Sequence, residues 1–393
     1  MAPPFQRRTP GRTTTRVLAL VLAGLLLAIG AVGTVVWQRL GTGRTTVHGV
    51  IGSEKEPYFE HPDVVARFAE LGYEVVVETA GSRAIATSAD LSGVDFAFPS
   101  STPAAEEIAR RWDVDRRYEP FYSPMAVLSR ASVAETLAAE GVAERAADGT
   151  WTFDMAGYLE LTEERTRWRD LGGQESNRNE VLVRTTDPRS SNSAAMYLVV
   201  TGYLLNGEEV VQEGDADGDM MDEVARLFLA QGDPPQTSQQ PFDQFVALGA
   251  GHTPLLWGYE AQFVAAKLNM ASFPEDIVLM YPGPTTISTH TVLPLTEAGD
   301  EIGRLLSEDP ELQRLAARHG FRTNDPDEFA QVVAENDLPV RAQIADVVNA
   351  PAHEVLNGMI AEVERRYSDS GAGPPAADEG ELPDMPELDE EAA

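Results

Sequence analysis

The chain has 393 residues, of which 43% are hydrophobic, and this is enough for two globular domains with a sizeable core. Its formal net charge is −33, so the protein repels phosphate backbones and we do not expect nucleic acid as a partner. The sequence contains no Cys, which excludes a lipoprotein anchor, disulfides, thiolate zinc sites and Cys nucleophiles.

An uncharged and almost wholly apolar run covers residues 17–37. It is about as long as a helix that crosses a bilayer. Arginines precede it, which places the N-terminus in the cytoplasm and the rest of the chain outside. A cleaved signal peptide is the alternative, but its apolar core is usually shorter, and this run lacks a clean Ala-x-Ala cleavage site. We expect residues 1–44 to be a cytoplasmic stub and a single-pass transmembrane anchor in the cell membrane. In either case the body is extracytoplasmic.

Strands alternate with helices in the first part of the body. The expected strands are Val47–Gly52, Tyr73–Thr79, Val94–Phe98 and Phe121–Ser129, with helices near 61–71 and up to Arg111. This alternation predicts an α/β domain with a mostly parallel sheet.

The second part begins with a helical, polar stretch from 131 to 173. The further expected elements are a strand from Val181, a helix over Ala194–Leu205, helices near 220–231 and 241–248, and strands at 254–257 and 277–281. The last strand is followed by a Pro- and Thr-rich segment over 282–290, to which we assign no element, and then by helices to about Tyr367. Residues 368–393, rich in acids, Pro and Gly, are expected to be a disordered tail.

Polar loops follow several of the predicted strands. In open α/β sheets, ligands bind beyond the carboxyl ends of the strands, where helix N-termini offer unpaired N–H groups. The candidate ligand-binding residues in these loops are Ser53, Gly81, Ser82, Arg83, Ser100, Ser101, Thr102 and Ser123. Together they predict a cleft lined with hydroxyl and backbone donors.

The most informative stretch is the start of the helix after the strand at Val181. Pro188 and the polar residues that follow it are typical of a helix N-terminus. Ser190, Ser191 and Ser193 supply more hydroxyls than one helix cap needs, which favours a role in binding an anionic or strongly polar ligand. An ordinary cap is the alternative.

Motifs for other chemistry fail or are missing. The acidic run from Asp215 has Met220 at the sixth position of a calcium loop and Arg226 at the twelfth, so it is not an EF-hand. The six His residues are scattered, without a metal-binding motif, and we expect most of them at the surface or at helix caps. No nucleophile elbow or nucleotide-binding loop is present. We predict no metal, no cofactor and no catalytic residue, and hence a protein that is not an enzyme.

The order of these motifs over roughly residues 46–323 resembles a type 2 periplasmic binding protein, in the style of the branch that binds molybdate, sulfate and phosphate. The residues that carry the resemblance are Ser53, Gly81-Ser82-Arg83, Asp187-Pro188-Arg189-Ser190-Ser191 and the Tyr259-Glu260 pair. It implies an α/β, two-lobed fold, here with an N-terminal transmembrane helix. It adds Asp187, Tyr259 and Glu260 to the candidate ligand-binding residues. The expected domains are lobe 1 (45–130 plus 277–325), lobe 2 (131–276) and C-terminal helices (326–367).

The resemblance further implies a membrane-anchored solute-binding protein that captures a small anionic ligand, such as an oxyanion, between its lobes. Neutral hydroxyls and helix N-termini would hold the ligand, and the lobes would close about crossovers near 129–131 and 273–277. A transporter permease or another membrane protein is the expected partner. The alternative is a non-transport scaffold or sensor with a vestigial cleft, which docks a protein partner.

Overall fold

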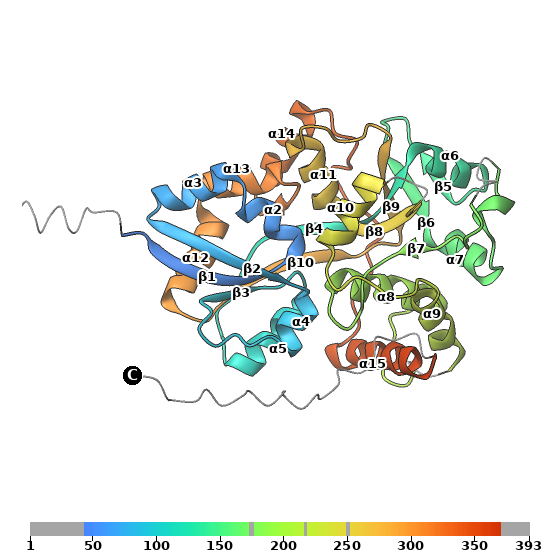
Figure 1. Cartoon of the computed structure of the whole chain (residues 1–393), viewed down its shortest axis with the longest axis horizontal. Coiled ribbons are helices and arrows are strands. Elements are labelled where there is room, and N and C mark those ends of the chain that lie inside the picture. The colour runs from blue at the N-terminus through green and yellow to red at the C-terminus, as the bar shows by residue number, and fades with distance from the viewer. Residues whose placement is uncertain (1–42, 173–176, 216–217, 249–251, 371–393) are drawn as a thin grey trace, which may run out of the picture.

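The computed structural model describes residues 43–172, 177–215, 218–248 and 252–370. They form a mixed α/β molecule in which helices cover a branched sheet (Figure 1). In these ranges no helix is both long and apolar enough to cross a membrane. The predicted anchor at 17–37 lies outside the described residues, as do residues 371–393 of the predicted tail. The tail residues 368–370 belong to the last helix of the structure.

One half of the sheet follows the predicted alternation of strands and helices. Strand β1 (Thr45–Gly52) pairs in parallel with β2 (Tyr73–Ala80) and with β3 (Phe96–Phe98). After these strands come η1 (Ser53–Lys55), α2 (Glu56–Phe59), α3 (Pro62–Glu70), α4 (Ser82–Thr87) and α5 (Thr102–Trp112). We call this half, with its helices, the β1 lobe.

A single long strand joins this half to the rest of the sheet. Strand β4 (Tyr118–Arg130) pairs along its first part with β10 (Ile287–Pro294). Along its second part it pairs with β8 (Leu255–Tyr259) and β9 (Ile277–Gly283). All of these pairings are antiparallel, so the prediction of a mostly parallel sheet is wrong. Strand β10, which begins at Ile287, was not predicted from the sequence.

The other half, which we call the β8 lobe, is mainly helical around a small sheet. Its further strands are β5 (Ala143–Arg145), β6 (Trp151–Asp154) and β7 (Val183–Arg184). Its helices are α6 (Ala131–Ala139), α7 (Met155–Glu163), η2 (Trp168–Asp170), α8 (Asn192–Leu205), α9 (Asp219–Leu229), α10 (Gln239–Leu248) and α11 (Glu260–Asn269). Strand β9, which the expected ranges assign to lobe 1, pairs with β4 and β6 on this side. The predicted domain ranges themselves stay a prediction.

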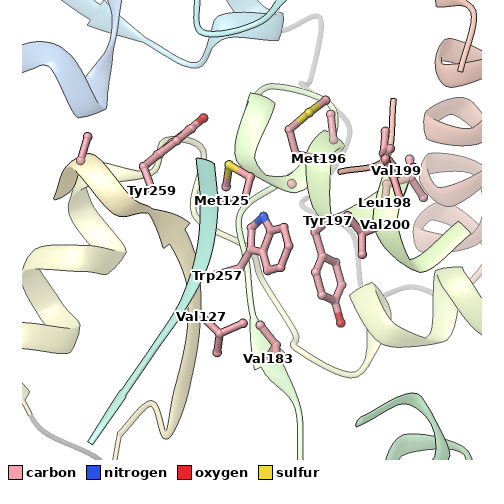
Figure 2. Close-up of a cluster of buried hydrophobic side chains, with 14 of the residues drawn as sticks. Met125, Val127, Val183, Met196, Tyr197, Leu198, Val199, Val200, Trp257 and Tyr259 are labelled. Carbon is pink, nitrogen blue, oxygen red and sulfur yellow. The ribbon is translucent and has the colours of Figure 1, made fainter. Parts of the chain in front are cut away.

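Helix α8 is the centre of the core of the β8 lobe. Every residue from Asn192 to Gly202 is buried, so the helix has apolar neighbours all round. Tyr197 packs edge-on against Trp257, with ring centroids 5.4 Å apart (Figure 2). The Tyr197 hydroxyl is 2.8 Å from that of Tyr158, which satisfies both buried polar groups. This packing holds the N-terminus of α8 rigidly at the junction of the lobes.

The C-terminal part of the chain returns across both lobes. It contains α12 (Glu297–Glu308), α13 (Pro310–Arg318), β11 (Arg322–Thr323), α14 (Pro326–Glu335) and α15 (His353–Ser370). Helix α15 packs along α9 (Figure 1). There the Tyr367 hydroxyl donates a hydrogen bond to the carbonyl of Phe228 (2.9 Å). At the other end of α15, His353 lies 3.0 Å from Glu107 of α5. Helix α15 therefore contacts both lobes.

Candidate functional site

Loops of both lobes meet where the predicted strands end. The Ser53 hydroxyl accepts hydrogen bonds from the backbone N–H groups of Ser238 and Gln239, both at 3.2 Å. A side chain of the β1 lobe thus caps the start of α10 in the β8 lobe. Beside it, the Ser82 hydroxyl accepts a hydrogen bond from the Ser100 N–H (2.9 Å), which joins two of the predicted loops.

A second contact between the lobes involves backbone atoms only. The carbonyl of Ser190, just before α8, accepts hydrogen bonds from the N–H groups of Arg83 (2.9 Å) and Ala84 (3.0 Å). This approach requires glycine at position 81, because a Cβ there would overlap the Ser190 carbonyl. The structure therefore brings Gly81 and Ser190, predicted from separate motifs, into direct contact.

The ammonium group of Lys55 lies at the centre of this junction and is completely buried. Its Nζ is 2.6 Å from Oε1 of Glu54, 2.7 Å from the Ser100 hydroxyl and 3.1 Å from Nδ1 of His290. The 3-10 turn after β1 turns Glu54 and Lys55 inward. Gly52 permits this turn, because a Cβ on it would crowd the side chains of Ser100, Glu54 and Lys55.

Glu54 and Lys55 form a charged pair inside the protein. Burial alone would raise the pKa of Glu54, but the Lys55 charge, the interaction with His290 and the hydrogen bonds from Lys55 and Ser100 together outweigh burial, and the pKa falls to about 2. Burial lowers the pKa of Lys55, and the Glu54 carboxylate partly opposes this. Burial, together with the Lys55 charge, lowers the pKa of His290 well below its ordinary value. His290 is thus neutral at neutral pH, and its Nδ1 accepts a hydrogen bond from Lys55.

Asn192, the first residue of α8, connects the lobes next to Lys55. Its side-chain NH₂ donates to the Ser100 carbonyl (2.9 Å), the Tyr259 hydroxyl (3.2 Å) and the Ser288 hydroxyl (3.1 Å). We define the central polar cluster as Glu54, Lys55, Ser100, Asn192, Tyr259, Ser288 and His290, all of them buried. Both lobes contribute to it, so any ligand held here would contact both.

A cavity of about 280 Å³ adjoins the central polar cluster at Glu54. Glu54 is the residue of the central polar cluster that lines this Glu54 cavity, and residues of α10 and α11 also line it. Its lining residues are Glu54, Pro57, His61, Gln239, Phe242, Asp243, Gln262, Ala265, Ala266, Asn269, Met270 and His319. Elsewhere in the described ranges, as here, no group of three or more His, Asp or Glu side chains is placed to hold a metal ion.

Comparison with known proteins by sequence and by structure gives different results. No protein-family model matches the sequence, and no curated protein matches it either. Solved structures do match. The sulfate-binding protein SubI from Mycobacterium tuberculosis superposes with a TM-score of 0.52 at 19% identity, covering 82% of this chain and 99% of that one. The apo ferric ion-binding protein A of Pasteurella haemolytica gives a TM-score of 0.51 at 11% identity, covering 84% and 98%.

The chain has the type 2 periplasmic binding protein fold. The resemblance inferred from the order of the motifs is confirmed for the fold. In this fold, Ser53, Gly81, Ser82, Ser100, Ser190 and Tyr259 are predicted residues that lie at the junction of the lobes. Whether they bind a ligand stays a prediction.

Other predicted residues form hydrogen bonds or ion pairs inside the protein, or are exposed. Ser123 does not end a strand but lies within β4, and its hydroxyl accepts a hydrogen bond from the Ala261 N–H (3.2 Å). Glu260 is fully buried and pairs with Arg322 (2.7 Å), which makes it part of an internal ion pair. Ser101 caps α5 through the N–H of Ala104 (3.4 Å), and the neighbouring Thr102 is exposed.

The remaining predicted residues form ion pairs or hydrogen bonds with nearby side chains, and one of them contacts helix α15. Asp187 pairs with Arg189 at 2.6 Å. The hydroxyls of Ser191 and Ser193 lie 3.1 Å apart, and the Ser193 hydroxyl is 2.7 Å from that of Thr186. Arg83 donates to the side-chain oxygen of Asn357 in α15 (2.7 Å). These side chains thus make hydrogen bonds within the protein, and ligand binding by them stays a prediction.

The sequence places Lys55 near the proposed mouth of the cleft, but Lys55, Asn192 and His290 were not among the predicted binding residues. Most of the six His residues were expected at the surface or at helix caps. His290 and His319 are the buried exceptions, whereas His61 caps α3. One feature of the sequence could have identified Lys55 as a site residue. The sequence has only two lysines, Lys55 and Lys267, among 30 basic residues, and Lys55 directly follows a predicted strand.

Proposed function

We propose that this protein is an extracytoplasmic solute-binding protein that holds a small anion between its lobes, next to Lys55. The buried ammonium group of Lys55 carries the proposal. Burying a charge is costly unless a counter-charge and hydrogen bonds compensate it, so such a group marks a place where a negative charge belongs. This differs from the initial expectation that neutral hydroxyls and helix N-termini alone would bind the anion.

The surroundings of Lys55 suit an anion further. The hydroxyls of Ser100 and Ser238 and the side-chain amide of Asn192 are hydrogen-bond donors at the same junction. Donors from two lobes allow the ligand to favour the closed state, which is how hinged binding proteins respond to a solute. We include no catalytic step in the proposal, because binding alone accounts for this arrangement.

We also propose that residues 17–37 hold this body at the outer face of the cell membrane, beside a permease or another membrane partner. The uncharged length of this run and the arginines before it support the proposal. Membrane fractionation tests it: the full chain should sediment with membranes, and a variant lacking residues 1–42 should not. Equal distribution of the two proteins would contradict the anchor.

The binding proposal is tested by thermal unfolding with sulfate, phosphate, molybdate, tungstate and small organic acids. An anion that binds only the folded protein stabilises it, by about 2.7 kcal/mol at a hundred times its Kd. The matched control is the double variant Lys55→Met with Glu54→Gln, which removes both charges of the pair. It should lose the stabilisation by the anion while remaining folded.

A non-transport scaffold is the second candidate, and one observation favours it. Glu54 already neutralises Lys55 inside the cluster, so the folded protein has no uncompensated charge there. If no anion stabilises the protein at millimolar concentrations, the solute-binding proposal fails and the scaffold is favoured.

A further inference from the structure

The position of the Glu54 carboxylate indicates what the binding site accepts. Its Oε1 takes hydrogen bonds from the Lys55 ammonium and the Ser100 hydroxyl, both of the β1 lobe. Its Oε2 is 3.4 Å from the hydroxyl of Ser238, which belongs to the β8 lobe. A carboxylate thus already sits between the lobes, with donors from both sides on its two oxygens. This arrangement has the form expected for a bound carboxylate ligand.

The Glu54 cavity adjoins this residue. Its volume of about 280 Å³ is near the lower end of small-molecule pockets, which span roughly 300–1,000 Å³. Phe242, Ala266 and Met270 contribute apolar surface to its wall. A bare oxyanion at Lys55 would leave this space unfilled, whereas an acid with an organic body would bury the apolar wall.

The polar groups of the cavity wall suit a body without a second negative charge. Asp243 lies in the wall, and its carboxylate would repel another anionic group. His319 is almost completely buried, and within the described part of the chain neither of its ring nitrogens has a hydrogen-bond partner. A hydroxyl or carbonyl on the ligand body would satisfy them.

The geometry points to a small organic acid with a single carboxylate as the ligand. Its carboxylate would displace that of Glu54 from Lys55, and its body would occupy the Glu54 cavity. This inference rests on the proposed function, since it names the ligand class of the same site. In this arrangement Glu54 is a competitor built into the chain, because it and the ligand use the same ammonium and hydroxyl donors.

Calorimetric titration with benzoate, acetate and sulfate tests the inference on the full chain. Benzoate has a carboxylate and a body, acetate has hardly any body, and sulfate has no carboxylate. We expect benzoate to bind at least tenfold more tightly than acetate or sulfate. The variant Glu54→Gln should bind benzoate at least tenfold more tightly than the wild type, because the competing charge is gone.

A second variant serves if Glu54→Gln does not fold. Ala265, half-buried in the wall of the cavity, is changed to Trp to fill the space. Ala265→Trp should weaken benzoate binding at least tenfold and leave acetate binding within threefold. The matched control is Ala66→Trp on the exposed face of α3, which should change neither.

The possible failures separate the two proposals. If sulfate binds at Lys55 and no carboxylate does, the ligand class is wrong but the solute-binding function stands. The same conclusion follows if Ala265→Trp weakens benzoate and acetate equally. If no anion binds to the wild type or to Glu54→Gln, both proposals fail.

Discussion

At the scale of single residues, Lys55 and Glu54 decide the character of the site. Neither side chain has appreciable exposure, and the ion pair between them is 2.6 Å long. Two opposite charges taken out of water together can nearly balance their cost, but either charge alone cannot. The sequence shows only that they are adjacent. Their burial depends on Ser100 and on His290, which is 235 positions away from Lys55, and no local pattern reveals such a distant contact.

Removing one charge of this pair should destabilise the fold more than removing both. Glu54→Gln leaves the Lys55 ammonium buried without its counter-charge, which costs roughly 3–5 kcal/mol. The double variant Lys55→Met with Glu54→Gln replaces the pair by neutral groups of similar size and should lose less. Urea unfolding at pH 7 measures the difference. A double variant less stable than the single one would contradict this, because it would show that Lys55 stabilises the fold without its counter-charge, through Ser100 and His290.

The pair should also make the stability of the fold sensitive to acid. The pKa of Glu54 lies near 2 in the folded protein and is ordinarily 4.5, so the unfolded chain takes up the proton first as the pH falls. The contribution of Glu54 is therefore present above pH 4.5 and is lost as the pH drops toward 2, at about 1.4 kcal/mol for each pKa unit. Unfolding curves at pH 7, 5 and 3 should show a steeper loss in the wild type than in the double variant. Parallel losses would mean that Glu54 is not responsible.

At the scale of elements, the sequence patterns predict most of the strands and helices but not all pairings. Caps and apolar periodicity are local, and α3, α5 and α8 lie close to their predicted positions. Strand β10 was missed because its Ser, Thr and His residues resemble a polar loop, although Ser288 and His290 are completely buried. The same strand supplies two residues of the central polar cluster. Because β10 was not predicted, Ser288 and His290 were not predicted as site residues either.

The contact between α4 and the start of α8 can be tested at Gly81. The change Gly81→Ala places a Cβ against the Ser190 carbonyl and should force the two elements apart. We expect a loss of about 1–3 kcal/mol, the range for overpacking a well-packed site. The control is Gly358→Ala in α15, where the added Cβ meets no atom and should stabilise the helix slightly. Thermal unfolding of Gly81→Ala and Gly358→Ala measures the difference. Equal stability of the two variants would contradict the contact.

At the scale of the whole molecule, helix α15 connects the two lobes. Arg83 and Glu107 of the β1 lobe contact Asn357 and His353 at one end of α15, while Tyr367 packs on the β8 lobe. The sequence predicts helices in this region but not their position, because an amphipathic helix does not specify which surface it covers. The convergence of Ser- and Gly-rich loops on one junction was predictable, since it follows from strand order and the shared edge of the sheet.

The contacts of α15 with both lobes should contribute measurably to the free energy of unfolding. The change Asn357→Ala leaves the largely buried Arg83 guanidinium without this acceptor, which costs roughly 1–3 kcal/mol. Glu354→Ala, at an exposed position of the same helix, should stay within about 0.5 kcal/mol of the wild type. Urea unfolding compares the two. Equal losses would show that the hydrogen bond to Arg83 does not hold the lobes.

The most direct test of anion binding at Lys55 is a nitrogen NMR titration of the full chain labelled with ¹⁵N-lysine. The only two lysines, buried Lys55 and the partly exposed Lys267, give separate signals. When a bound anion such as benzoate or sulfate is titrated in, the Nζ signal of Lys55 should shift to saturation while that of Lys267 stays in place. Binding detected by calorimetry with no change at Lys55 would contradict the proposed site.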